Sequence, residues 1–141
     1  MLSDVTAAVN ELDEEALVVD GPGGQGEAVA DTLALHSGPV TILNADLPCV
    51  TSAEIEELTV AAPALVAARD GTTNALALRD VGDFKPLYGP GSAARFADHL
   101  GAVSLDLSGL QDDVDTWDDV ERVRERVGKH THRYLSRLAR V

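Results

Sequence analysis

The sequence predicts an α/β sandwich with a mostly parallel sheet. Its 141 residues, 45% of them hydrophobic, suit one compact domain with a real core. Short apolar runs typical of buried strands alternate with segments in which apolar residues recur about every 3.6 residues. This alternation is typical of helices packed on a mostly parallel sheet. Because no repeat or linker divides the chain, we expect a single domain over residues 1–141.

Five apolar runs are the expected strands, because each is short and continuous, as buried strands are. They are "ALVV" (16–19), "PVTIL" (39–43), "ALVAA" (64–68), "ALAL" (75–78) and "AVSLDL" (102–107). The segments between them carry the helical period: "GEAVADTLALH" (26–36), "SAEIEELTV" (52–60) and "GSAARFADHLG" (91–101). A short basic helix with an apolar stripe that ends at Val141 is expected at about 128–141.

Charge and composition exclude several classes of protein. The net charge of −13 argues against a nucleic-acid-binding protein, because the phosphates would be repelled. The same charge suits an organism with a salt-rich cytosol. No stretch resembles a signal peptide, and "TVAAPALVAA" (59–68) is too short to cross a bilayer. The single cysteine, Cys49, excludes an internal disulfide, and we interpret it as a buried residue rather than a nucleophile. A cytoplasmic location is therefore expected.

The segment "DDVDTWDDV" (112–120) divides into two parts. Thr116 and Asp119 have the spacing of a helix cap, and Asp118 and Asp119 would face the positive end of the helix dipole. Asp113 and Asp115 flank Val114 in an extended stretch, so both carboxylates point to one side and repel each other unless a cation lies between them. Taken alone, the stretch is better interpreted as a salt-screened acidic loop than as a metal site.

Asp46 makes the cation site the better interpretation. It follows the apolar run "VTIL" (40–43), and ligands of open α/β sheets gather past the carboxyl ends of strands. Arriving from a different strand, it could complete an oxygen ligand set with Asp113 and Asp115 for Mg²⁺ or Mn²⁺. We therefore expect the three carboxylates to converge.

Four motifs in order resemble the 2-phospho-L-lactate guanylyltransferases of coenzyme F-420 biosynthesis: "NADLP" (44–48), "GTTNALAL" (71–78), "YGPGS" (88–92) and "DVDTWDDV" (113–120). The resemblance covers about residues 16–125. It implies a three-layer, nucleotide-diphospho-sugar transferase-like sandwich. It also implies GMP transfer from GTP to a small phosphorylated carboxylic acid, with release of pyrophosphate. The acceptor would be 2-phospholactate, phosphoenolpyruvate or 3-phosphoglycerate.

The resemblance also implies roles for individual residues. Asp46, Asp113 and Asp115 would be catalytic and would hold Mg²⁺ or Mn²⁺, while Thr73, Gly89 and Ser92 would bind the acceptor. Glycines that bring N–H groups close to a ligand, and a serine that begins a helix, agree with anion binding, although a capped Gly-Pro turn is the alternative. We expect the N–H groups around Gly89–Ser92 and the Thr73 hydroxyl to face one cleft, on the same side of the sheet end as Asp46.

The chain also departs from the family pattern. In the glycine-rich loop "GPGGQGEA" (21–28), Gly26 stands where the family has Asn, and Phe96 stands where a histidine is common; His99 is expected at the surface. The family's first strand and its basic donor-phosphate loop have no counterpart, and neither Lys85 nor an early arginine replaces them. The run 40–43 should then be an exposed sheet edge, and a homodimer is possible. The alternatives are a partner-binding remnant without catalysis and a nucleotidyltransferase with a different acceptor.

Overall fold

The computed structural model describes residues 1–139, and Arg140 and Val141, the end of the predicted apolar stripe, lie outside the described residues. It confirms the α/β class: within this range seven α-helices, a 3-10 turn and a sheet of four strands are formed. The helices are α1 (Leu2–Asn10), α2 (Gln25–Leu33), α3 (Ser52–Val60), α4 (Ser92–Leu100), α5 (Ser108–Gln111), α6 (Trp117–Val123) and α7 (Lys129–Leu138). The strands are β1 (Val40–Leu43), β2 (Ala64–Ala67), β3 (Thr73–Leu78) and β4 (Val103–Ser104).

The sheet is mixed, in the order β1-β3-β2-β4. Strand β3 is antiparallel to both of its neighbours, and only the short β2–β4 pairing is parallel. Strands β1, β2 and β4 therefore run in one direction, but the expectation of mostly parallel pairing is wrong. The turn between β2 and β3, residues 68–72, is too short for a parallel crossover, and its Asp70-Gly71 pair is a typical hairpin signal.

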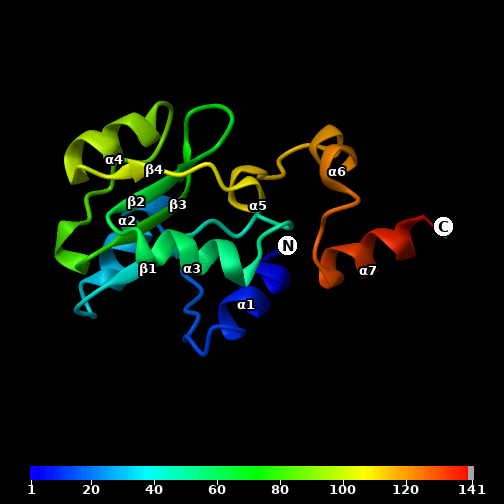
Figure 1. The fold of residues 1–141 in the computed structure, drawn as a ribbon, viewed down its shortest axis with the longest axis horizontal. Coiled ribbons are helices and arrows are strands. Elements are labelled where there is room, and N and C mark those ends of the chain that lie inside the picture. Colours follow the sequence, from blue (N-terminus) through cyan, green and yellow to red (C-terminus); the bar gives the residue numbers. More distant parts are fainter. Residues whose placement is uncertain (140–141) are drawn as a thin grey trace.

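Helices cover both faces of the sheet, as Figure 1 shows. Alternate residues of β2 and β3 point to opposite sides. Large side chains, among them Leu65, Leu76 and Leu78, pack against Phe96 of α4. On the other face, the smaller Ala64, Val66, Ala75 and Ala77 pack against Ile55 and Leu58 of α3, Leu110 of α5 and Val5 of α1. Every residue of β3 is buried, so this strand is the centre of the core.

The apolar run at residues 16–19 does not form a strand, contrary to the prediction. It pairs with no described strand, and Leu17 and Val18 are 52% and 63% exposed. A strand needs a neighbour for its backbone hydrogen bonds, and this run pairs with no described strand. Strand β1 is a sheet edge, as expected: its only described partner is β3, and its four residues are half-buried.

Helices α6 and α7 lie to one side of the sheet, and α7 packs on α1 (Figure 1). The carboxylate of Asp4 in α1 accepts hydrogen bonds from the N–H groups of His130 (3.0 Å) and Thr131 (2.9 Å) and from the Thr131 hydroxyl (2.6 Å). These donors belong to the first turn of α7, so a residue near the start of the chain caps the last helix. The basic helix predicted at about 128–141 is confirmed over Lys129–Leu138.

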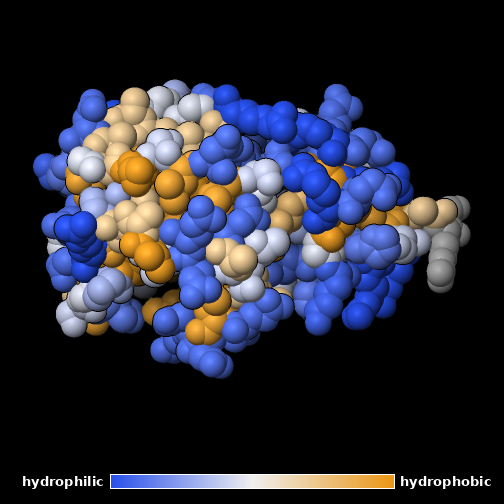
Figure 2. All heavy atoms as spheres, in the orientation of Figure 1, coloured by the Kyte–Doolittle hydropathy of each residue, from blue (hydrophilic) through white to orange (hydrophobic). Residues whose placement is uncertain are grey.

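The face seen in Figure 2 is largely hydrophilic, and its hydrophobic atoms gather over the half of the molecule that holds the sheet. Within residues 1–139 no helix is both long and apolar enough to cross a bilayer.

Candidate functional site: three converging aspartates

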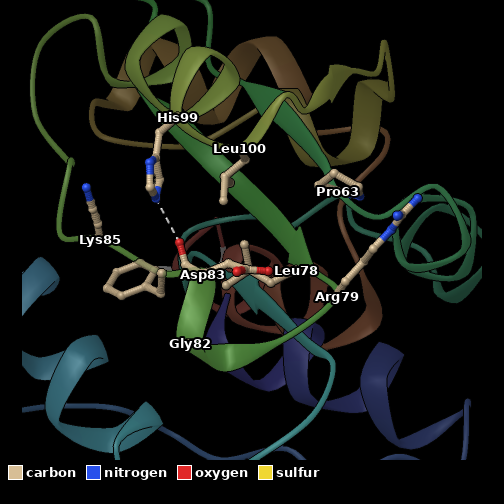
Figure 3. Close-up of a pocket in the computed structure, with 9 residues that line it drawn as sticks. Pro63, Leu78, Arg79, Gly82, Asp83, Lys85, His99 and Leu100 are labelled. Atoms are coloured by element: carbon tan, nitrogen blue, oxygen red, sulfur yellow. Dashed lines mark hydrogen bonds between the residues drawn. The ribbon is translucent and has the colours of Figure 1, made fainter.

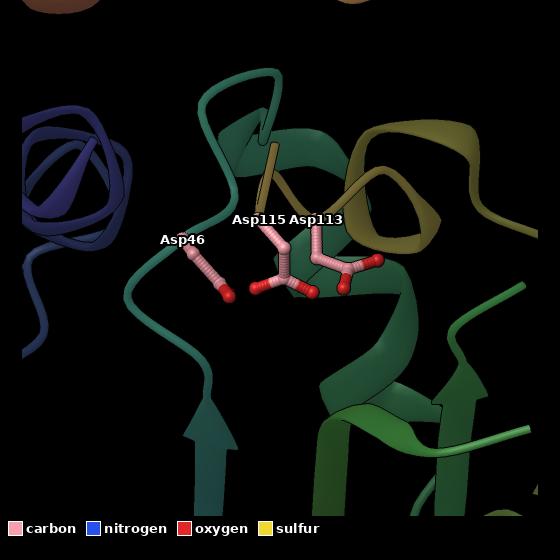
Figure 4. Close-up of side chains that lie close together, drawn as sticks. All are labelled: Asp46, Asp113 and Asp115. Carbon is pink, nitrogen blue, oxygen red and sulfur yellow. The ribbon is translucent and has the colours of Figure 1, made fainter. Parts of the chain in front are cut away.

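The three aspartates converge. Asp46 lies just after β1, while Asp113 and Asp115 lie in the extended segment between α5 and α6. One oxygen from each carboxylate lies within 4.8 Å of the other two, and Figure 4 shows the three side chains beside one another. The Val114 N–H donates to the Asp46 carbonyl (3.1 Å), which ties the two segments together. The alternation inferred from the sequence thus brings both flanking carboxylates to Asp46.

The electrostatics of this cluster favour a cation. Burial raises the pKa of Asp46, and the charges of Asp113 and Asp115 raise it further. Its Oδ1 atom is buried and has no hydrogen-bond partner among the described residues. A buried carboxylate oxygen without a partner is costly unless it binds a cation or a proton. The ligand set consists only of oxygens, as hard cations such as Mg²⁺ and Mn²⁺ prefer, so the residues present fit such an ion.

The neighbouring aspartates have structural roles. Thr116 and Asp119 form the predicted capping box at the start of α6, and Asp119 also accepts from the Asp115 N–H (3.2 Å). Hydrogen bonds from Thr116 and an ion pair with Arg122 lower the pKa of Asp119 far below its usual range. Asp118 is exposed in the first turn of the helix, as the sequence predicts.

Asp112 was missed by sequence reasoning, which grouped it with the acidic segment. Its side chain is 3% exposed and pairs with Arg69 (3.1 Å) and Arg126, with Arg122 at 3.9 Å. Arg122 also donates to the Asp113 carbonyl (3.4 Å), so this network fixes the start of the extended segment. The only sequence signal for this ion-pair network was the run of arginines that follows Asp112 in the chain.

The predicted acceptor residues lie at the same end of the sheet. Thr73 begins β3, which runs antiparallel to β1, so its position matches the carboxyl end of β1 and Asp46. However, the hydroxyls of Thr73 and Ser92 hydrogen-bond to each other (2.9 Å) and both residues are buried. The Ser92 N–H already donates to the Gly89 carbonyl (3.0 Å). The structure therefore brings the two hydroxyls together, but it buries them against each other.

The loop that precedes α4 is held by one arginine. The Arg95 guanidinium donates to the carbonyls of Leu87 (2.9 Å and 3.2 Å), Tyr88 (3.3 Å) and Pro90 (2.6 Å). Gly89 and Gly91 have φ of 111° and 73°, values that L side chains rarely adopt, which explains the glycines of "YGPGS". This clamp fixes the loop without any ligand.

A groove of about 840 Å³ runs along the open edge of β1. Helices α1 and α2, residues 15–21 and Asp46 are among the parts of the chain that line it. Gln25, the first residue of α2, also lines the groove, and its Nε2 donates to the side-chain oxygen Oδ1 of Asn44 (2.7 Å). No Lys or Arg is among its described lining residues.

A second cavity, of about 380 Å³, lies at the opposite end of the sheet (Figure 3). Leu78, the last residue of β3, and Pro63, which precedes β2, line it together with Lys85 and His99. His99 hydrogen-bonds to the Asp83 carbonyl (2.9 Å) and is exposed, as predicted. Phe96 is fully buried on the apolar face of α4, and Cys49 is buried with its pKa raised by burial.

Comparison with known proteins supplies the family. No family model matches the chain. It is 40% identical to a phosphoenolpyruvate guanylyltransferase of Nocardia farcinica, over 70% of this chain and 46% of the relative. Proteins of the same name from Streptomyces scabiei and Sphaerobacter thermophilus are 36% and 37% identical, each over 77% of this chain and 58% of the relative. The chain thus spans about half the length of the curated relatives it matches. The resemblance drawn from the four motifs is confirmed, and this chain is related, over most of its length, to the phosphoenolpyruvate guanylyltransferase family.

Proposed function

We propose that this chain takes part in guanylyl transfer from GTP to a small phosphorylated carboxylic acid, with release of pyrophosphate. The observation that carries the proposal is the convergence of Asp46, Asp113 and Asp115 around a carboxylate oxygen without a partner, in a relative of guanylyltransferases. The relatives' name favours phosphoenolpyruvate as acceptor over 2-phospholactate and 3-phosphoglycerate. The reaction would belong to coenzyme F-420 biosynthesis, in the cytoplasm.

The chemistry needs no covalent intermediate with the protein. An oxygen of the acceptor phosphate attacks the α-phosphorus of GTP, and the bond from that phosphorus to the β-phosphate's bridging oxygen breaks. Both reactants are polyanions, and a divalent cation, when bound, neutralises their oxygens and stabilises the leaving pyrophosphate. Asp46, Asp113 and Asp115 would hold Mg²⁺ or Mn²⁺. The hydrogen bond from the Val114 N–H to the Asp46 carbonyl would hold the three carboxylates close together before substrates bind.

Thr73, Gly89 and Ser92 would bind the acceptor. They lie at the Asp46 end of the sheet, and α4 begins there, so an anion would meet the positive end of a nine-residue helix. The acceptor would have to displace the hydrogen bond between the Thr73 and Ser92 hydroxyls. We further propose that the helices and sheet are the nucleotide-diphospho-sugar transferase-like sandwich of this family.

The test is a screen for pyrophosphate release. The full chain is incubated with Mg²⁺, each of the four nucleoside triphosphates and each of the three acceptors. Release that requires GTP and one acceptor supports the proposal, provided that Asp46→Asn abolishes it and Asp118→Asn, at an exposed acidic neighbour, does not. Release that is equal in wild type and Asp46→Asn would contradict the assigned site.

The alternative is a partner-binding module without catalysis. The observation that favours it is the groove along β1, which offers no described Lys or Arg for a triphosphate. This alternative predicts that the chain binds divalent cations but neither binds GTP nor releases pyrophosphate with any nucleotide. A third possibility, a different acceptor, predicts GTP-dependent release with none of the three acceptors but with another phosphorylated acid.

A further inference from the structure

Three side-chain amides form a continuous chain from the glycine-rich loop to the aspartate cluster. Gln25 Nε2 donates to Asn44 Oδ1 (2.7 Å), Asn44 Nδ2 donates to Asn74 Oδ1 (3.3 Å), and Asn74 Nδ2 donates to Asp113 Oδ1 (3.3 Å). The four residues come from α2, the end of β1, the start of β3 and the segment after α5. These residues are separated in the sequence, and no motif in it predicts that their side chains contact one another.

Each amide in this chain has a fixed orientation. Asn74 is 2% exposed, and its Nδ2 also donates to the Gln111 carbonyl (3.1 Å), so both of its protons are used. Asn44 Nδ2 also donates to the Thr73 carbonyl (3.3 Å). An amide has two donor protons on one side and an acceptor oxygen on the other, so reversing either asparagine would place its oxygen against two acceptors. The donors therefore all point toward Asp113.

The two ends of the chain of amides differ in exposure. Asp113 accepts from Asn74 on Oδ1, and one oxygen of the same carboxylate lies in the cluster with Asp46 and Asp115. Gln25, the first residue of α2, is exposed and lines the same groove as Asp46. A change at Gln25 can thus reach a cation ligand without any contact between Gln25 and the cation.

We propose that Asn74, Asn44 and Gln25 are positioning residues that hold the Asp113 carboxylate for the cation, and that Gln25 links the glycine-rich loop to the affinity of that site. This inference rests on the proposed cation site of the proposed function. Partners of metal ligands fix the ligand's orientation, and their loss typically costs about 10–100-fold in metal affinity. Here the partner of Asp113 is Asn74, the last of three hydrogen-bonded amides that begin at the exposed Gln25. A change at Gln25 should therefore reach Asp113 through these hydrogen bonds.

Replacing Gln25 by Glu tests the polarity. A carboxylate has no proton to donate to Asn44 Oδ1, so the hydrogen bond is replaced by repulsion. This repulsion displaces the Asn44 amide and, through it, the Asn74 amide that donates to Asp113. Gln25→Ala only removes the last link and should have a smaller effect. The control is Asn10→Asp, which adds the same charge at an exposed position of α1. Since Gln25 is itself exposed, none of these variants disturbs the core.

The first readout needs no metal. In nitrogen-15 NMR spectra of the metal-free chain, the side-chain amide signals of Asn74 should shift in Gln25→Glu and stay in place in Asn10→Asp. A merely local role of Gln25 would leave the Asn74 signals unmoved, and that result would overturn the inference.

The second readout is Mn²⁺ affinity, measured by calorimetry at fixed ionic strength. We expect Gln25→Glu to weaken binding about tenfold, Gln25→Ala to weaken it less, and Asn10→Asp to leave it unchanged. A charge that acted directly on the cation would strengthen binding instead, so an unchanged or increased affinity in Gln25→Glu would overturn the inference. If the wild type binds no Mn²⁺, the proposed function fails, while the NMR comparison still decides whether the amides are coupled.

Discussion

Removing the Asp4 carboxylate should release α7 from α1. In Asp4→Ala, the two N–H groups in the first turn of α7 and the buried Thr131 hydroxyl lose their acceptor. Hydrogen bonds to a charged group contribute about 1.5–3 kcal/mol each, and loss of a helix cap costs about 0.5–2 kcal/mol. The donors become partly hydrated when α7 detaches, so we expect the free energy of unfolding to fall by about 2–4 kcal/mol rather than by the sum.

The pH dependence gives a second signature of the same contact. Burial raises the pKa of Asp4, but the hydrogen bonds from Thr131 and His130 outweigh it, and the net pKa is lowered. A group with a lowered pKa in the folded state stabilises the fold fully above its unfolded pKa, about 3.9. That contribution is lost as the pH falls through the lower folded pKa. The stability difference between wild type and Asp4→Ala should therefore shrink as the pH falls below about 4.

The assay is urea unfolding followed by circular dichroism, at fixed salt, from pH 3 to pH 7. Asp31→Ala is the control, because Asp31 is exposed on α2 and should change the free energy of unfolding by less than about 0.5 kcal/mol. Gly128→Ala is an independent test, since a Cβ at Gly128 would overlap the Asp4 carboxylate. If Asp4→Ala is no less stable than Asp31→Ala, or if its stability difference from wild type grows at low pH, the reasoning is refuted.

Three further predictions concern the edge strand, the acceptor loop and the core. The N–H of Thr41 faces away from β3, so Thr41→Pro removes a donor only from the open edge of β1. Light scattering should show less self-association in this variant, and an unchanged mass would argue against assembly through this edge. Ser92→Ala leaves the Thr73 hydroxyl without its partner and should raise the acceptor concentration needed for half-maximal pyrophosphate release; an unchanged value would remove Ser92 from the site. Phe96→Ala should cost about 3–5 kcal/mol in urea unfolding, and a loss below about 1 kcal/mol would mean that the α4 core is not packed as described.

The sequence predicted those helices and contacts whose signals lie within a few neighbouring residues. The period of "SAEIEELTV" gave α3, and the spacing of Thr116 and Asp119 gave the capping box of α6. The alternation in Asp113-Val114-Asp115, with Asp46 after an apolar run, was enough to predict that the three carboxylates converge. In each case the physical cause lies within a few residues or at the end of a strand.

Other features depend on neighbours that a pattern does not reveal. The run 16–19 is as apolar as β1, yet it pairs with no described strand and lines a groove beside β1 instead. The burial of Asp112 depends on Arg69, which is distant in sequence. The alignment of Asn44 with Asn74 follows from the β1–β3 register. The Asp70-Gly71 turn is different, since it was a local signal of an antiparallel hairpin that the reading of β2 and β3 did not use.

The central claim is that Asp46, Asp113 and Asp115 share a divalent cation. Its most direct test is the thermal unfolding of the metal-free chain with added Mg²⁺ or Mn²⁺ at fixed high ionic strength. A ligand at 100 times its Kd adds about 2.7 kcal/mol to the free energy of unfolding, so Tm should rise in wild type. It should not rise in Asp46→Asn or Asp115→Asn. Asp118→Asn should cost only about 0.3–1 kcal/mol of helix stability and keep the rise. A rise of equal size in wild type and Asp46→Asn, or its loss in Asp118→Asn alone, would contradict the account.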